Sequence, residues 1–176
     1  MGYCHPYKSQ ALVKTSSNKV LEVSALRCPF GRGLVACIPG IIAINIVEYI
    51  LKLMQISETP LPQAGAIFFL TEEAARTPLG IAIGFFAHIF VAVLAGILIS
   101  YYIYYSGTDY AVIKGIVISM LFLFITLGIV FPLRDLAVEM QGSPNDVLAA
   151  IIDHTVFGAL VGWTIKYLQE KQAVLR

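Results

Sequence analysis

Apolar positions along the chain fall into four long runs that are separated by short polar stretches. A helix needs about 20 predominantly apolar residues to cross the hydrocarbon core of a bilayer, and each run has that length. We therefore predict four membrane-spanning helices, at residues 34–54, 79–103, 111–133 and 147–168.

Composition supports the same class of protein. Of the 176 residues, 58% are hydrophobic and 13% are charged, whereas about a quarter of a soluble domain is charged. We expect an all-α, integral membrane four-helix bundle over residues 33–171, preceded by a flexible cytoplasmic tail at 1–32 and followed by a cytoplasmic C-terminus at 172–176. No small-residue cleavage site follows the first run, which predicts a retained span instead of a signal peptide.

Lysine and arginine predict the orientation, because short cytoplasmic loops are enriched in them. Most of them lie before the first run, in the second loop or at the end of the chain. This distribution predicts that both termini lie in the cytoplasm of a bacterial inner membrane. These cations are Lys8, Lys14, Lys19, Arg27, Arg32, Lys114, Lys166, Lys171 and Arg176, against Lys52, Arg76 and Arg134 on the outer side. A tyrosine belt is expected at the inner interface, formed by Tyr101, Tyr102, Tyr104, Tyr105 and Tyr110.

The cysteines predict no site. Cys4, Cys28 and Cys37 are odd in number and lack a C-x-x-C spacing, which favours three ordinary thiols over a disulfide framework or a zinc site.

The second and fourth runs resemble each other when His88 is aligned with His154. This second-to-fourth alignment also places Thr77-Pro78 over Ser143-Pro144. A hydroxyl residue followed by proline is typical of a helix start, where the side chain caps free amides and proline takes the first helical position. Further matches pair Gly96 with Gly162 and Tyr101 with Tyr167.

A fainter first-to-third alignment places Gly33 over Gly115 and Lys52 over Arg134. We expect two parallel two-helix repeats, related by an approximate two-fold axis along the membrane normal. The first outer loop must then be longer than its counterpart, because Lys52 lies farther from Thr77 along the chain than Arg134 lies from Ser143. We expect that loop, within 58–76, to hold a short helix on the outer surface.

Small residues share a helix face with each histidine, because residues four apart lie on the same side of a helix. Small residues let membrane helices approach closely, so both histidines are predicted to face protein. The helix-packing positions are Gly80, Gly84, Ala92 and Gly96 around His88, and Gly158 and Gly162 after His154.

Polar residues gather in the outer half of the predicted bundle, and intramembrane ionisable groups usually face its interior. This candidate polar cluster consists of Asn45, Glu48, His88, Asp153 and His154. Structural roles are open: Glu48 pairing with Lys52 four residues on, histidines linking neighbouring helices, and Arg134-Asp135 as an interfacial ion pair. Pro39-Gly40 is expected to loosen the first helix.

Two functional roles are also open for the cluster. Two histidines related by a two-fold axis could approach one metal ion or haem iron, with Glu48 or Asp153 completing the ligand set. Alternatively, Glu48 and the histidines could change charge along a proton or substrate pathway. With four helices for each chain, such a transporter would require a homodimer or a partner subunit.

The ends of the third and fourth runs carry a family resemblance. Ile129-Val130-Phe131-Pro132-Leu133, and Val156 to Gly162 followed by Tyr167, resemble the YqhR-like group of small four-helix bacterial inner-membrane proteins. The resemblance covers about residues 77–171. It implies a four-helix membrane protein and supplies no activity, cofactor or site residue.

These patterns favour a non-catalytic membrane protein that acts in assembly, envelope maintenance or partner binding, as a homo-oligomer or with a membrane-protein partner. Proton-linked transport or metal or haem binding is the alternative. The chain lacks a nucleophile elbow and a Gly-rich phosphate loop, so we expect neither an enzyme nor a cofactor, and no nucleic-acid partner.

Overall fold

The computed structural model describes residues 28–57, 61–133 and 143–174, and within these ranges all regular structure is helical. The all-α class is therefore confirmed. Four helices are long and apolar enough to cross a membrane. They are α2 (Pro29–Leu53), α5 (Pro78–Ser106), α6 (Ala111–Ile125) with its continuation, and α9 (Pro144–Val174).

The helix starts of α5 and α9 follow the predicted hydroxyl-proline rule. Thr77 Oγ1 accepts a hydrogen bond from the amide of Gly80 at 3.1 Å, and Ser143 Oγ accepts one from the amide of Asp146 at 3.3 Å. Proline is the first helical residue in both cases. This prediction is confirmed at both positions.

The start of α2 corrects the predicted tail. Helix α2 begins at Pro29, ahead of the predicted span and inside the tail assigned to residues 1–32. Proline favours the first helical position because its fixed φ suits a helix and its missing N–H needs no partner there. Cys28 is disulfide-bonded, so the expectation of three ordinary thiols is wrong. The rest of the tail, residues 1–27, lies outside the described residues.

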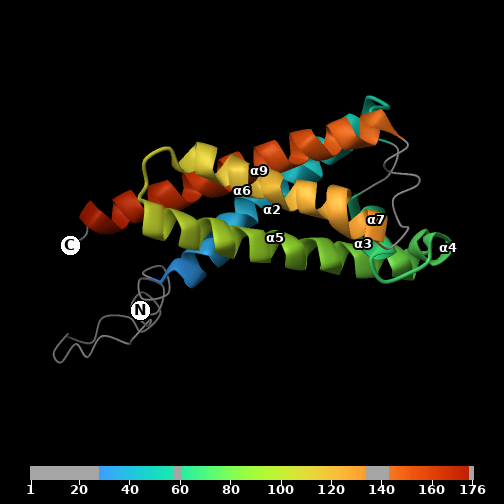
Figure 1. Cartoon of the computed structure of the whole chain (residues 1–176), viewed down its shortest axis with the longest axis horizontal. Helices are drawn as coiled ribbons and strands as arrows, with labels where there is room; N and C mark the ends of the chain where they lie inside the picture. The colour runs from blue at the N-terminus through green and yellow to red at the C-terminus, as the bar shows by residue number, and fades with distance from the viewer. Residues whose placement is uncertain (1–27, 58–60, 134–142, 175–176) are drawn as a thin grey trace.

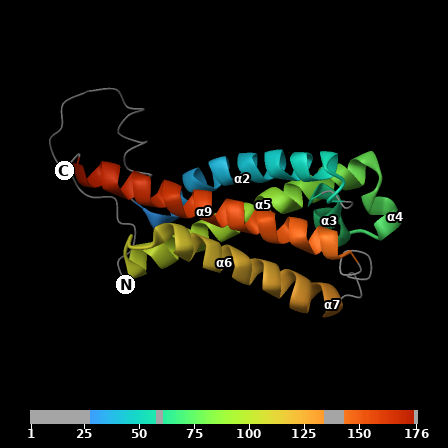
Figure 2. The same cartoon turned by 90° about the horizontal axis from the view of Figure 1, so that it is seen from above.

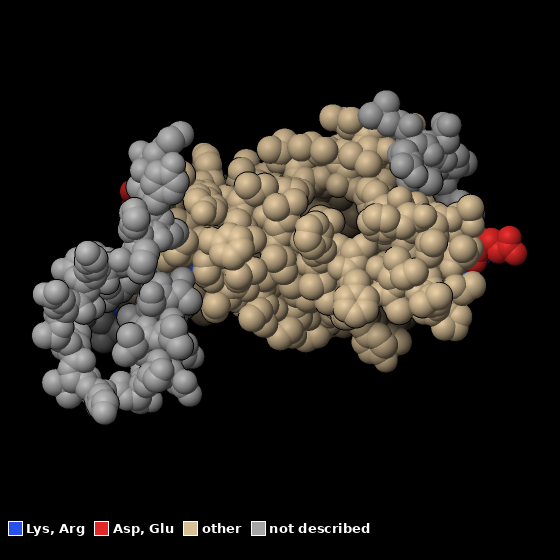
Figure 3. Space-filling view, turned by 90° about the horizontal axis from the view of Figure 1, so that it is seen from below, with Lys and Arg blue, Asp and Glu red and all other residues tan. Residues whose placement is uncertain are grey.

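The helices are arranged around α9, which packs along both α6 and α2, while α2 also packs along α5 (Figures 1 and 2). Helix α2 begins and α9 ends at one end of the bundle, which also carries the turn between α5 and α6. We call this the terminal end, and the opposite end the far end. The described surface is almost uncharged between the two ends on the face shown in Figure 3, as expected for a surface in contact with lipid.

Short helices fill the far end between α5 and the last part of the third span. We expected one short helix on the outer surface within residues 58–76, but the structure has α3 (Leu61–Ile67) and α4 (Glu72–Ala75). Helix α3 packs into the bundle because glycines bring its backbone against α5: a Cβ on Gly65 would lie 2.5 Å from the carbonyl oxygen of Gly84. The Phe68 ring contacts the Phe131 ring with centroids 5.0 Å apart.

The third span changes its helical pitch near its end. A π-helical segment, η1 (Thr126–Val130), joins α6 to α7 (Phe131–Leu133). Proline has no amide hydrogen and its ring clashes with the carbonyl four residues earlier, so Pro132 disfavours regular α-helix over Gly128 to Pro132. The wider π turn accommodates it. The predicted Arg134-Asp135 ion pair lies outside the described residues.

Glycines set the distance between the long helices. A Cβ on Gly158 would lie 2.5 Å from the carbonyl oxygen of Gly115 on α6, and one on Gly33 would lie 2.6 Å from the Cα of Ile97 on α5. The predicted packing positions are buried against different elements. Gly80 meets α4, Gly84 meets α3, Ala92 is buried on the same face, Gly96 meets α2, and Gly158 and Gly162 meet α6.

Replacing Gly158 with alanine should destabilise the protein by about 1 to 3 kcal/mol, because the added methyl forces α9 and α6 apart. The matched control is Gly128→Ala, since a Cβ there meets nothing within 4 Å. The measurement is the unfolding midpoint of the purified protein in detergent. Equal midpoints for the two variants would contradict the close contact.

Candidate functional site

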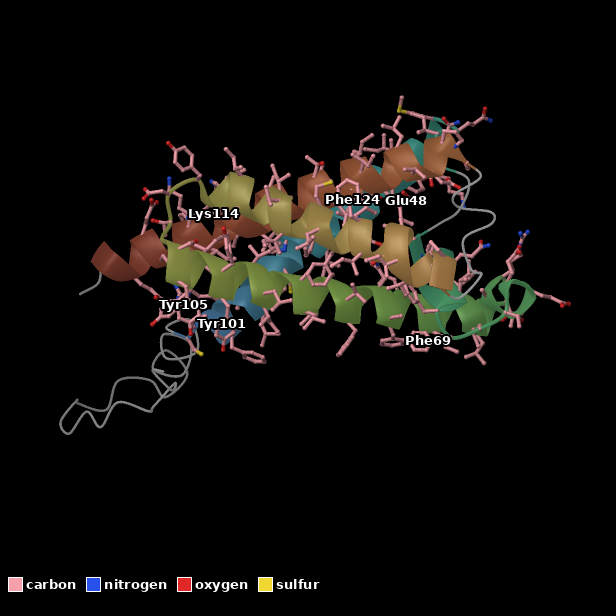
Figure 4. The ribbon with its side chains drawn as sticks, in the orientation of Figure 1. Glu48, Phe69, Tyr101, Tyr105, Lys114 and Phe124 are labelled. Atoms are coloured by element: carbon pink, nitrogen blue, oxygen red, sulfur yellow. The ribbon has the colours of Figure 1, made fainter. Side chains whose placement is uncertain are left out.

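Two carboxyl side chains face each other where α2 meets α9. Glu48 on α2 is 8% exposed and Asp153 on α9 is 2% exposed, and the Glu48 carboxyl is the neighbour of the Asp153 carboxyl. Glu48 lies just over one turn before the end of α2, which is about 8 Å at about 1.5 Å per residue. Figure 4 labels Glu48 in this part of the bundle. We call Glu48 and Asp153 the acid pair.

Ser57 is the hydrogen-bond partner of Glu48. Its Oγ donates to Glu48 Oε1 at 2.6 Å, and the side chain is 5% exposed. The chain turns back after α2 at Gln55, whose φ is 57°, and the amides of Ile56 and Ser57 donate to the Leu51 carbonyl. This turn carries Ser57 over the acid pair.

The expected pairing of Glu48 with Lys52 is absent from the ion pairs of the described residues, and Lys52 is exposed. Lys52 lies a full turn farther toward the far end, where its ammonium group reaches water, whereas Glu48 is held inside by Ser57. The four-residue spacing permits an ion pair between Glu48 and Lys52, but it does not indicate that the Ser57 hydroxyl bonds to Glu48 instead.

Asp153 meets no N–H or hydroxyl donor in the described structure, where both of its carboxylate oxygens are buried. The side chain that hydrogen-bonds with it is the Glu48 carboxyl, and no Lys or Arg forms an ion pair with either member of the acid pair there. Two carboxylates that share a buried site cannot both be ionised cheaply, because each repels the other and both lose water. One proton held between the two groups removes the repulsion and supplies a donor.

The two histidines form a separate group. His154 Nδ1 lies 2.9 Å from the Ala150 carbonyl oxygen; a carbonyl only accepts, so Nδ1 donates. His88 Nε2 is buried without a partner in the described structure, and His154 is its neighbour. Each histidine lies equally far along its helix from the starting proline, which brings both rings to the same level of the bundle.

The candidate polar cluster is therefore divided. Glu48 and Asp153 are brought together at the contact of α2 with α9, and His88 and His154 at that of α5 with α9. Asn45 donates to the Ile41 carbonyl of its own helix at 2.7 Å. In the described ranges, no hydrogen bond or ion pair joins a histidine to an acid.

A metal centre lacks a ligand set in the described part of the chain, where no group of three or more His, Cys, Asp and Glu side chains is placed to hold an ion. The acid pair and the histidines lie along different helix contacts. A single ion would therefore meet at most two of these side chains.

A second buried charge lies at the terminal end and was missed from the sequence. Arg32 is 4% exposed and its guanidinium lies 5.6 Å from the centroid of the Tyr104 ring. The sequence pattern predicts Arg32 as a cation of the cytoplasmic tail, whereas the structure buries it in the first turn of α2. The tyrosine belt lies at this end of the bundle, where Figure 4 labels Tyr101, Tyr105 and Lys114.

Comparison with known proteins returns no match for this chain among protein-family models, curated proteins or solved structures.

Stability of the folded protein should fall as pH rises from about 7 to 8, above the range in which the histidines of the unfolded chain titrate, because the acid pair keeps a proton that the unfolded chain has released. The slope should approach about 1.4 kcal/mol per pH unit for each proton released on unfolding. Asp153→Asn should flatten this dependence, whereas Asp109→Asn, at an exposed position in the turn before α6, should not. Unfolding midpoints in detergent at several pH values measure it, and equal slopes for all three proteins would show that no proton is held.

Proposed function

We propose that this chain is a non-catalytic, multi-pass membrane protein that binds a proton between Glu48 and Asp153 and couples its occupancy to the contact between α2 and α9. The observation that carries the proposal is the acid pair itself, which is buried between two spanning helices without a Lys or Arg partner in the described residues. The output is assembly or partner binding within a bacterial inner membrane.

Coupling follows from where the acid pair lies. When the proton leaves, two negative charges face each other across the contact of α2 with α9, and their repulsion is strong because the surroundings are apolar. Phe157 packs on Gly40 one to two turns away along the same contact. Loss of the proton therefore loosens a packed helix pair and changes the surface that a partner meets.

Internal duplication supports the same architecture. The first-to-third and second-to-fourth alignments map the close approach of Gly33 and Gly96, between α2 and α5, onto that of Gly115 and Gly162, between α6 and α9. The equivalent helix caps of α5 and α9 support it too. We propose that α2–α5 and α6–α9 are two parallel repeats, with α3 and α4 in the extra length of the first pair.

Charge distribution supports cytoplasmic termini. Arg32, Lys114, Lys166 and Lys171 lie at the terminal end of the described structure, whereas the far end carries Lys52 and Arg76, and Arg76 is paired with Glu72. The disulfide at Cys28 weighs the other way, because reducing compartments keep thiols unpaired. The lysine and arginine bias outweighs it, since it extends over both ends and the second loop and acts during insertion.

A protonated carboxyl should persist at neutral pH in the purified protein and be visible as its infrared carbonyl band. The band should disappear in the double variant Glu48→Gln/Asp153→Asn and remain in the control Glu72→Gln, which changes a carboxyl on α4 at the far end. Absence of the band at neutral pH, or its persistence in the double variant, would refute the proposed proton site.

Cysteine labelling in intact bacterial cells should reveal the orientation. In a background with Cys4, Cys28 and Cys37 replaced by serine, an impermeant maleimide should label Arg76→Cys from outside and Lys171→Cys only after permeabilisation. The reverse pattern would place the far end in the cytoplasm.

A further inference from the structure

We infer that the acid pair exchanges its proton with the far side of the membrane only, so that the chain reads the pH of that side and does not conduct protons through the bundle. This inference rests on the proposed proton site and adds the direction from which the site is reached. It is carried by the unequal surroundings of the acid pair along the two directions of the helices.

Toward the far end, polar groups continue from the acid pair. The Ser57 hydroxyl bonds to Glu48 and lies in the turn that follows α2, and a hydroxyl both donates and accepts a proton. On α9, Asp146 lies two turns before Asp153 on the same face. Both groups lie on the far-end side of the acid pair.

Toward the terminal end, the same faces turn apolar within one turn, apart from Asn45, whose side-chain amide is bonded to the Ile41 carbonyl of its own helix. One turn below Glu48 on α2 lies Ile44, and one turn below Asp153 on α9 lies Phe157, which are 4% and 5% exposed. The Phe157 ring rests on the α2 backbone, because a Cβ on Gly40 would lie 2.8 Å from its Cδ2. Val161, fully buried, follows on α9. We call Ile44, Phe157 and Val161 the apolar plug.

The other helices complete the plug at the same level. Ala92 on α5, one turn below His88, is buried. On α6, Gly115 packs against the Gly158 backbone next to Phe157, and Ile118 and Phe122 pack against the same core cluster as Phe157. Residues from all four spanning helices thus close the centre of the bundle.

Polar atoms reappear only far beyond the plug. Ser100 and Thr164 carry buried hydroxyls there without a partner in the described structure, and the buried Cys37 thiol is bonded to the Leu34 carbonyl of its own helix. The buried Ser119 hydroxyl on α6 lies above the plug, near the level of Asp153, because Gly115 one turn below it packs on Gly158. Thr164 lies three turns beyond Asp153, a rise of about 16 Å, whereas one hydrogen-bonded step covers about 2.8 Å. A proton would need several ordered waters to cross this gap, and apolar spaces stay dry.

Other charged groups near the acid pair do not bridge the plug. The titratable groups facing this region are His88 on α5 and Asp146 and His154 on α9, and all lie at the level of the acid pair or nearer the far end. Lys52 on α2 and the α4 side chains Glu72, Glu73 and Arg76 lie at the far end, while α3 carries no titratable residue and the only one described on α6 is Lys114, at the terminal end.

The test is proton flux into proteoliposomes that contain the full chain and a pH-sensitive dye in the lumen. Under an imposed pH gradient, the wild-type protein should acidify the lumen no faster than Asp153→Asn. Phe157→Ala should acidify it several-fold faster, and Phe157→Ala/Asp153→Asn should return to the wild-type rate. Phe90→Ala removes an equally large ring from the lipid-facing side of α5 and should leave the rate unchanged.

Ile44→Ala provides a second opening of the plug from α2, in case Phe157→Ala does not fold. Wild-type flux above that of Asp153→Asn would overturn one-sided access while leaving the proton site in place. No acceleration in either plug variant would overturn the role of the plug. Failure of the proposed function itself is separate, because it would appear as loss of the infrared carboxyl band at neutral pH.

Discussion

Contact between glycine backbones holds α9 against α6, and the positions of the other helices follow from that contact. Lipid provides no hydrophobic drive for helices to associate, so close van der Waals packing has to do it. Gly115, Gly158 and Gly162 bring the two backbones together, and on the opposite side of α9 the Phe157 ring fits over Gly40 of α2. Helix α9 therefore packs against neighbours on two sides. This packing buries Asp153 and His154 whether or not hydrogen-bond partners are available to them.

Burying the acid pair is costly, which is why its surroundings matter. An aspartate near the centre of a spanning helix costs about 2.5 to 3.5 kcal/mol on insertion scales, and a second acid beside it adds repulsion. Ser57 donates to one oxygen of Glu48, while the oxygens of Asp153 receive no N–H or hydroxyl donor in the described residues. A bound proton relieves this arrangement most directly, and in the proposed function the repulsion that returns without it acts on the helix contact.

The two helix pairs differ where the acid pair lies. The first-to-third alignment places Glu48 over Val130, and the second-to-fourth alignment places Ala87 over Asp153, whereas both histidines are kept. Only the contact of α2 with α9 therefore carries an acid pair in the described structure. Where α5 and the end of the third span would meet in the equivalent way, α3 lies between them, with Phe68 against Phe131. In the proposed duplication, α3 thus occupies the place equivalent to that of the acid pair.

Properties that depend on one helix at a time were already determined by the sequence. Four apolar runs, the caps at Thr77 and Ser143 and the small-residue faces around His88 and His154 follow from spacing within a helix. Arrangement between helices was decided only in three dimensions. The sequence grouped Asn45, Glu48, Asp153 and the histidines by depth alone, but the structure separates acids from histidines because α9 presents Asp153 and His154, which are adjacent residues, to different neighbours. The left-handed turn at Gln55 brings Ser57 to Glu48, and Gly40 leaves room for the Phe157 ring on α2. Both contacts depend on how separate segments pack, which spacing within one helix does not predict.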